Sequence, residues 1–364
     1  SRSKSPFNRL VLETFVNHMA PPEILYEKKP HIGTDLLRPL IISMRKKIEE
    51  NGGQVHFEHR VVDFVIENDK IVGVKLANDK IFYSEVIVLA IGHSARGLFR
   101  LLESYQVAVE NKPFAVGFRI EHPQDFINKH QYRTYADSPY LGAADYQLTY
   151  HDNKTNRGVY TFCMCPGGEV VLASSEEGRL CVNGMSYHSR DKENANSAIL
   201  VSVDERDYGS EPLAGLKFQE MLEEKAFALT GKSNVAPVQT LTDFGNQKIT
   251  TKMGQVNPSV VNYKLCNLSS LLPEHPYTQL RNAIGEFDKK FSNFAMEDAI
   301  LTGIETRSSS PLKILRDKYS FQSFSHPSLY PIGEGAGYAG GIMSAAMDGL
   351  KVAESLILSY DKQG

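Results

Sequence analysis

The sequence is poor in cysteine, in long apolar runs and in charge of one sign. Its 364 residues hold four cysteines, without a CxxC pair or a matching histidine spacing, which argues against a secreted disulfide scaffold or a zinc module. The longest apolar run, residues 86–92, is far shorter than the ~20 residues that span a bilayer. Lys and Arg number 40 against 43 Asp and Glu, so neither nucleic acid nor an anionic membrane is favoured as a partner. We expect a soluble, cytoplasmic protein without a signal peptide, whose ligand is a small molecule.

The first third of the chain predicts alternating helix and strand. Thr34 is a plausible N-cap for a helix with apolar residues at helical spacing, and Gly52 and Gly53 end that helix. Residues 54–58 alternate and predict a strand. Residues 61–85 predict a three-stranded meander with turns at 68–69 and 78–79. The apolar run at 86–92 is typical of a parallel strand covered on both faces.

The middle of the chain differs in composition from its two ends, which predicts a second domain. Residues 112–302 contain more Pro, Asn and Ser, several short strand-like runs, and a helix at 216–229. After this region the chain returns to a short apolar strand that ends in glycine, followed by a final helix. We therefore predict an α/β fold in which residues 1–111 and 303–364 form a discontinuous domain, and residues 112–302 form an inserted α+β domain.

The stretch "YPIGEGAGYAGGIMSAAMDG", residues 330–349, carries the strongest motif. Gly335, Gly337 and Gly340 spell GxGxxG, but only 24 residues follow Gly340. This is too short for the second strand and the acidic residue of a dinucleotide-binding βαβ unit, so we reject that interpretation. The glycines still let backbone amides approach a ligand, and the helix that follows favours an electron-rich group at its N-terminus. A plain strand-to-helix turn is the alternative.

Several motifs together resemble known flavoproteins. A strand closing on Gly-Glu, a small-residue loop and a C-terminal helix resemble the second flavin-binding motif of flavoproteins with two dinucleotide-binding folds. The stretch "VIVLAIGHSAR" after a meander resembles the element that precedes the substrate domain in that class. Nearly the whole chain is similar to a bacterial family of FAD-dependent dehydrogenases, through stretches such as "KPHIGTD", "KPFAVGFRIEHPQ", "FCMCPGGEVV", "ETRSSSP" and "GEGAGYAGGIMSAAMDG".

The resemblance implies FAD as cofactor, hydride transfer to or from the flavin, and a Rossmann-like FAD-binding domain with an inserted substrate domain. The family's primary FAD motif, an N-terminal strand followed by GxGxxG, is absent from the sequence. We therefore expect a fragment, truncated at its N-terminus, with an incomplete FAD site. The resemblance implies no particular substrate.

The resemblance also implies which residues bind the cofactor. Val61 would meet the adenine through its backbone. Gly92, His93 and Ser94 would border the ribose and the diphosphate. Glu334 would bind the ribityl hydroxyls. In the last loop, the amides at 340–342 would face flavin N1 and the C2 carbonyl, where negative charge accumulates on reduction. The expected contacts from this loop are Gly333, Gly335, Gly337, Gly340, Gly341 and Ile342.

Four residues are candidates for substrate chemistry. Arg190 or Arg307 could bind a carboxylate with two hydrogen bonds. Tyr187 or His188 could move a proton. Arg307 is the preferred candidate, because its segment leads directly to the flavin strand. The alternative for each of them is a side chain that orders a loop.

The CxC pair, Cys163 and Cys165, is a weaker candidate for redox chemistry. Residues two apart on a strand share a face, but a bridge between them would close a small, strained ring. Two thiols are too few ligands for a metal, so we predict no metal site. His31 is expected to belong to the structure that leads into the first long helix.

Two functions from different classes fit these features. The first is an FAD-dependent oxidoreductase. The second is a non-catalytic binding or regulatory module that keeps the flavoprotein fold. An NAD(P)-binding reductase is a weaker third possibility, because the sequence contains no complete βαβ fingerprint for that nucleotide.

Overall fold

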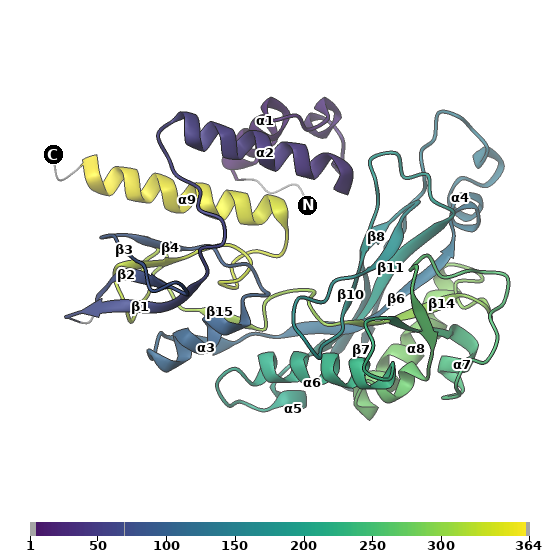
Figure 1. Ribbon diagram of the computed structural model, residues 1–364. Coiled ribbons are helices and arrows are strands. Elements are labelled where there is room, and N and C mark those ends of the chain that lie inside the picture. The colour runs from purple at the N-terminus through teal and green to yellow at the C-terminus, as the bar shows by residue number, and fades with distance from the viewer. Residues whose placement is uncertain (1–4, 69, 362–364) are drawn as a thin grey trace.

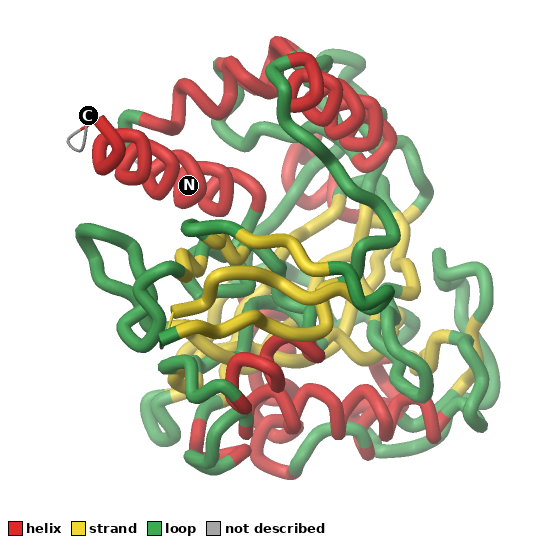
Figure 2. Tube along the Cα trace, turned by 60° about the vertical axis from the view of Figure 1, so that its left-hand side comes forward, coloured by secondary structure: helices red, strands yellow, loops and turns green. Residues whose placement is uncertain are grey.

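The computed structural model describes residues 5–68 and 70–361 and shows two lobes (Figure 1). One lobe holds the two ends of the chain and the other holds its middle, including the largest sheet. Helices lie on both sides of the strands when the molecule is turned (Figure 2). The longer helices and helical turns are α1 (Phe7–Asn17), α2 (Thr34–Glu50), α3 (Arg96–Ser104), α4 (Gln124–Tyr132), α5 (Glu205–Tyr208), α6 (Ala214–Leu229), α7 (Leu241–Gly245), α8 (Glu274–Lys290) and α9 (Ile342–Asp361).

The strands of the described residues fall into one large sheet and four small ones. Outside the large sheet they are β1 (Val61–Glu67), β2 (Lys70–Leu76), β3 (Ile81–Tyr83), β4 (Ile87–Leu89), β5 (Val109–Asn111), β9 (Glu169–Leu172), β10 (Val182–Met185), β15 (Leu312–Ile314) and β16 (Leu329–Pro331). The strands of the large sheet are β6 (Phe114–Pro123), β7 (Thr149–Asp152), β8 (Arg157–Cys165), β11 (Asn194–Val203), β12 (Ala236–Thr240), β13 (Tyr263–Leu265) and β14 (Ile300–Glu305).

The seven-stranded sheet has the order β13-β12-β14-β6-β11-β8-β7. Its central strands β6 and β11 pair antiparallel over ten residues, and they are buried almost throughout. Helices α6 and α8 contribute to the same core, which is the largest in the molecule. Within residues 112–302, the expected strand-like runs and the expected helix at 216–229 are present. The division at residues 112 and 302 stays a prediction.

Helix α8 is a long element that the sequence prediction does not include. It begins directly after Pro273 and buries one face. The signal is present in the sequence, since Tyr277, Leu280, Ile284 and Phe287 recur at helical spacing after the proline. The abundance of Pro, Asn and Ser around it conceals this pattern.

The meander and the short parallel pair form the other lobe. Strands β1, β2 and β3 pair antiparallel in chain order, which confirms the predicted meander. Its first turn includes position 69, which lies outside the described residues. Strands β4 and β16 pair parallel, with Ile87 opposite Leu329 and Leu89 opposite Pro331. Two segments some 240 residues apart in the chain therefore run side by side in one direction.

Two predictions about strands are wrong in part. Residues 54–58 form no strand; all of them are exposed, and no neighbouring strand in the described structure pairs with them. Strand β4 is not covered on both faces, because it belongs to a two-stranded sheet and Val88 is 44% exposed. An apolar run indicates a strand, but its burial depends on elements elsewhere in the chain.

The C-terminal end of α2 agrees with the prediction, whereas its N-terminal end does not. Gly33, with φ of 94°, occupies the N-cap position, and Thr34 is already helical. The Thr34 hydroxyl donates to the Ser186 carbonyl at 3.4 Å and does not cap the helix. At the other end Gly52 has φ of 83°, and the Gly53 N–H donates to the Ile48 carbonyl at 2.9 Å. The two glycines thus end the helix as expected.

None of the helices between residues 5 and 361 combines the length and the apolar content that crossing a bilayer requires. In the same described part of the chain, no group of three His, Cys, Asp or Glu side chains is arranged to hold a metal ion.

Candidate functional site

Two glycine-containing loops meet at the carboxyl ends of β4 and β16. Parallel strands end at the same edge of a sheet, so the loops that follow them become neighbours. The Ile332 N–H donates to the Leu89 carbonyl at 3.1 Å, which extends the pairing into the loops. A Cβ on Gly335 would lie 2.1 Å from the Gly92 carbonyl oxygen. The two backbones are thus in contact, and position 335 accepts no side chain.

Glu334 and His93 face each other across this contact. Glu334 Oε1 lies 3.7 Å from His93 Nε2, and both side chains are about one quarter exposed. Burial raises the pKa of Glu334, while the charge of Lys112 opposes the rise. Burial lowers the pKa of His93, and the cation of Arg307 adds to the effect. The structure therefore brings a carboxylate and a predominantly neutral imidazole together at the junction of the loops.

The last loop is held to helix α9 by a buried ion pair. The Gly333 N–H donates to Asp348 Oδ2 at 2.8 Å. Arg316 donates to Asp348 Oδ1 at 2.6 Å, and its guanidinium stacks on the Tyr338 ring at 3.7 Å. The sequence stretch "GEGAGYAGG" alone does not indicate these partners. Only the fold shows that Asp348, about two helical turns into α9, binds the backbone of the loop.

The start of α9 leaves open space beside it. A Cβ on Gly92, Gly340 or Gly341 would meet no atom within 4 Å. The first amides of a helix have no partner within the helix, so they can donate to a ligand. The Gly340 N–H donates to Ser344 Oγ at 3.2 Å. Within the predicted 340–342 set, the geometry therefore favours the amides of Gly341 and Ile342.

The preferred catalytic candidate, Arg307, lies in a dense cluster of charges. It donates to both carboxylate oxygens of Glu223, at 3.0 and 2.8 Å. Arg96 binds the same carboxylate, at 2.7 and 2.8 Å. Arg307 also donates to Ser94 at 3.3 Å and to Ser175 at 2.6 Å. Its side chain is only 8% exposed, so its hydrogen-bonding capacity is largely committed within the protein.

Glu223 is the centre of this cluster. Its side chain is fully buried. Burial alone would raise its pKa, but the hydrogen bonds from Arg307 and Arg96 lower the pKa to about 2. The Thr306 hydroxyl donates to Glu223 at 2.6 Å as well. Glu223 and Arg96 were missed by the sequence analysis, although Arg96 directly follows the "IGHSA" stretch that the resemblance includes.

The other three catalytic candidates lie elsewhere, in the loop between β10 and β11. The Tyr187 carbonyl lies 3.0 Å from His31 Nε2, and the ring of His188 stacks on that of His31. The His188 N–H donates to Asp35 at 2.9 Å. The Arg190 N–H donates to the Tyr187 carbonyl. These contacts dock the loop against the start of α2, which agrees with the structural role expected for His31.

A cavity of about 360 Å³ lies between this docked loop and the start of α9. Its lining is mainly apolar and rich in sulfur. The lining includes Leu12, Ile24, Cys163, Cys165, Met185 and Met343. Ile342 also lines it, so the cavity adjoins the first turn of the helix that follows the glycine loop.

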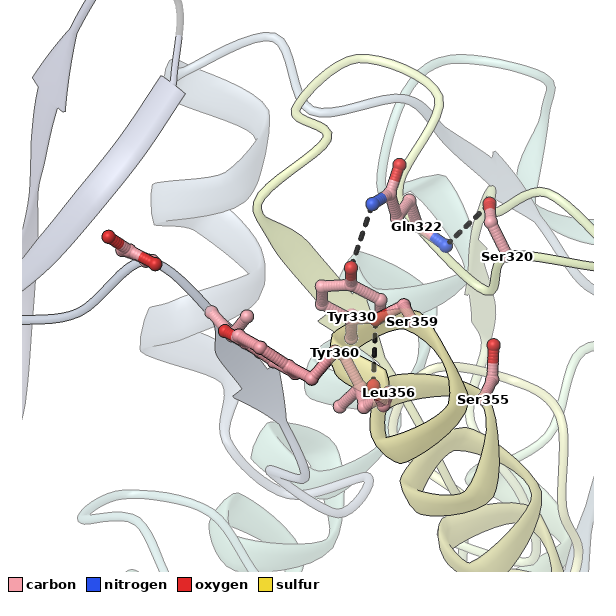
Figure 3. A pocket seen from close by; sticks show the side chains of 9 residues that line it. Ser320, Gln322, Tyr330, Ser355, Leu356, Ser359 and Tyr360 are labelled. Atoms are coloured by element: carbon pink, nitrogen blue, oxygen red, sulfur yellow. Dashed lines mark hydrogen bonds between the residues drawn. The ribbon is translucent and has the colours of Figure 1, made fainter. Parts of the chain in front are cut away.

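A second cavity, of about 260 Å³, lies at the other end of α9 (Figure 3). It is lined by polar residues of the loop at 320–322 and by Ser355 and Ser359 of the helix. The Gln322 amide donates to the Tyr330 hydroxyl at 2.7 Å across it. Ser355 is 13 residues from the start of α9, or about 20 Å along the axis. This cavity is therefore remote from the glycine loops.

Val61, the predicted adenine contact, begins strand β1 of the meander. The meander shares a hydrophobic cluster with β4 and with Ala336 of the last loop. The structure thus joins the meander to the glycine loops through packing.

Comparison with known proteins indicates a family. A family model described as "FAD-dependent protein, C-terminal domain-like" matches residues 113–308. A protein of Clostridium beijerinckii, described as an uncharacterized protein, is 48% identical over 353 residues, which are 96% of this chain and 66% of that protein. The chain thus spans 66% of the length of this curated relative.

Solved structures resemble the chain only distantly. An oxidoreductase from Methanosarcina mazei has 11% identity and a TM-score of 0.34, over 88% of this chain and 54% of that chain. Amadoriase I from Aspergillus fumigatus, a fructosyl amine:oxygen oxidoreductase, has 10% identity and a TM-score of 0.35, over 88% and 51%. Likeness at this level carries no argument about the site.

Proposed function

The chain belongs to the family of FAD-dependent proteins with this C-terminal domain, and from that premise we propose that it is the flavin-side part of an FAD-dependent oxidoreductase. Residues 1–111 and 303–364 would form part of the FAD-binding domain, and residues 112–302 the substrate domain. One observation carries the proposal. The loops after two parallel strands touch at Gly92 and Gly335, and the second loop leads into the N-terminus of α9, which therefore lies near this contact.

The residues present fit a flavin. The open space beside Gly92, Gly340 and Gly341 provides room for a ligand against the backbone. The half-buried Glu334 offers carboxylate oxygens at the edge of that space. When bound, the flavin supplies the group that accepts or donates the hydride. The protein's part is to bind and orient it and to favour one charge state.

Each part of the loop has a role in this proposal. Glu334 accepts hydrogen bonds from hydroxyl groups of the ribityl chain. The amides of Gly341 and Ile342 donate to the pyrimidine edge of the flavin and stabilise negative charge there. His93 and Ser94 border the ribose and the diphosphate, and Val61 lies on the adenine side.

We assign Arg307 to positioning. Its guanidinium is held by Glu223 and donates to Ser94 and Ser175, so it fixes the loop after β4 and has little capacity left for a substrate carboxylate. Tyr187, His188 and Arg190 order the loop that borders the apolar cavity. These roles correspond to the alternative that the sequence analysis named for each residue.

The diphosphate-binding βαβ unit would lie in sequence beyond this chain. Two observations support this part of the proposal. The matched relative is longer, and this chain spans 66% of it. Among residues 5–68 and 70–361, the two strands that have a later parallel partner, β4 and β12, do not lead into a GxGxxG loop.

The test is the flavin content of the complete gene product. We expect a yellow protein with flavin absorbance bands, or a colourless one that regains them with added FAD. Glu334→Ala should weaken FAD binding at least tenfold, because it removes the ribityl acceptor. The matched control is Glu354→Ala, on the exposed side of α9, which should bind as the wild type does. A complete protein that takes up no FAD would contradict the proposal and favour a non-catalytic module that keeps the fold.

A further inference from the structure

Two free cysteines lie side by side in the wall of the apolar cavity next to α9. Cys163 and Cys165 both line it. They differ in access, since Cys163 is exposed whereas Cys165 is buried. The Cys165 thiol donates to the Cys163 carbonyl at 3.4 Å. An accessible thiol beside a buried one is the arrangement of an attacking and a resolving cysteine.

The strand that carries them is irregular at this pair. Asn196 of β11 pairs with Cys165, whereas Ala198 pairs with Phe162, so β8 has one extra residue between these points. Cys163 itself has φ of 45°. Residues two apart on a regular strand are separated by about 6.6 Å, close to the upper limit of the Cα separation in a disulfide. A bulge with a left-handed residue bends the strand, so the spacing of a regular strand does not apply to this pair.

A buried cation lies beneath the pair. Arg119 is fully buried, and its Nη1 lies 2.8 Å from the Cys163 carbonyl oxygen and 4.0 Å from Cys165 Sγ. A Cβ at Gly184 would lie 2.4 Å from the same nitrogen, so a glycine is required where the neighbouring strand crosses the guanidinium. Glu305 is its carboxylate partner. The position of Arg119 favours negative charge on a nearby sulfur.

The two thiols consequently differ in acidity. Interaction with the Cys165 thiol holds the pKa of Cys163 below its usual range, and the charge of Arg119 adds to the lowering. The same interaction between the two thiols, together with burial, raises the pKa of Cys165. The exposed sulfur is therefore the nucleophile and the buried one remains protonated until it is needed.

We propose that Cys163 and Cys165 form a thiol pair that reduces small, uncharged disulfides entering this cavity. The Cys163 thiolate attacks one sulfur of the disulfide R–S–S–R, forming a mixed disulfide and releasing RS⁻, which takes up a proton. Cys165 then loses its proton and attacks Cys163 Sγ, forming the Cys163–Cys165 bond and releasing the second RSH. One disulfide is reduced to two thiols, and the dithiol of the protein is oxidised by the same two electrons.

The cavity selects the class of substrate. Its lining of Leu12, Ile24 and Met343 offers apolar contact, and methionine side chains adapt to irregular shapes. Arg119 is engaged with Glu305 and lies below the wall, so it does not recruit a carboxylate. The inference goes beyond the proposed oxidoreductase function and does not depend on it.

The experiment is a single turnover of the reduced protein with bis(2-hydroxyethyl) disulfide, followed by mass analysis of peptides without reduction. The wild type should release two thiols per chain and end with Cys163 bonded to Cys165. Cys165→Ser should stop at the mixed disulfide on Cys163. Cys163→Ser should release thiol only at the slow rate of its remaining cysteines, which are buried. Cys266→Ser, which alters a buried cysteine outside the lining of the cavity, is the matched control and should behave as the wild type does.

The rate adds a second readout. At pH 6 Cys163 should react about tenfold faster than a cysteine in an unfolded peptide, because a larger thiolate fraction outweighs the lower nucleophilicity of a more acidic thiol. Circular dichroism establishes that each variant is folded. A stable adduct on the wild type, or a Cys163 no more reactive than the peptide, would overturn the proposal. A protein that binds no FAD would leave these results unchanged, so the two proposals fail separately.

Discussion

The molecule contains two buried arginine clusters that differ in what balances their charge. In one, Arg96 and Arg307 share the carboxylate of Glu223, with Glu176 as a further acid. In the other, Arg119 has one carboxylate, Glu305, and its remaining donors reach a carbonyl, two amide oxygens and a thiol. In the first cluster, carboxylates within the cluster balance both arginines; we call this a closed ion network. In the second, one carboxylate faces Arg119, and the guanidinium also stabilises negative charge on a nearby sulfur atom.

The difference shows that an arginine near a glycine loop does not identify a substrate clamp. Arg307 has the position expected of a substrate-binding arginine, but its guanidinium already binds both carboxylate oxygens of Glu223. Arg119 has no motif around it that indicates chemistry, and yet it is the arginine that lies under an accessible cavity wall. What decides the role of a buried arginine is the number and kind of its acceptors.

The largest expected effect comes from removing the shared carboxylate. Glu223→Gln leaves two buried cations without their common partner and should lower the free energy of unfolding by about 3–5 kcal/mol. Urea unfolding at pH 7 measures it. The matched control is Glu224→Gln, the adjacent residue, which is half-exposed and pairs with Arg179; it should cost less than about 1 kcal/mol. Equal costs for the two variants would contradict the closed-network description.

The same cluster should respond to acid. The pKa of Glu223 is about 2 in the folded state, whereas its ordinary value is 4.5. The ionised carboxylate therefore contributes its full share of the free energy of unfolding above pH 4.5, and this share is lost as the pH falls towards 2. This shift corresponds to about 3 kcal/mol. The stability difference between the wild type and Glu223→Gln should therefore shrink between pH 5 and pH 2. A difference that stays constant over this range would show that the carboxylate does not titrate as described.

A smaller effect is expected in the second cluster. Glu305→Gln removes the carboxylate from Arg119, but the proposed Cys163 thiolate would still balance part of the guanidinium charge at pH 7. We expect a loss of about 1–2 kcal/mol, less than for a buried cation left alone. Adding Cys163→Ser should raise the cost of Glu305→Gln by at least about 1 kcal/mol, as a double-mutant cycle measures. A cost for Glu305→Gln as large as that for Glu223→Gln would mean that the thiolate does not balance the charge.

Local features of this chain were readable from its sequence. The meander, the short strands that precede Gly92 and Gly333, the final helix and the glycine end of α2 follow from residue periodicity and glycine placement. These signals reflect backbone conformation within a few residues of each other. Helix α8 was missed although its pattern is present, because the composition around it resembles that of loops.

The candidate site was predictable only where it lies in the loops themselves. Glu334 and His93 were named from the motifs and do face each other. Their supports, Asp348, Arg96 and Glu223, were not, because a buried ion pair links residues that lie up to 127 positions apart in the chain. No periodicity connects such partners.

The sequence alone determined which local elements form, because their signals lie within a few neighbouring residues. The tertiary structure decided which charges meet. It committed Arg307 to Glu223, separated it from the loop at 187–190, and placed Cys163 over Arg119 at a bulge in β8. The physical reason is that backbone conformation depends on neighbouring residues, whereas the balance of buried charge depends on which strands and helices come to lie side by side.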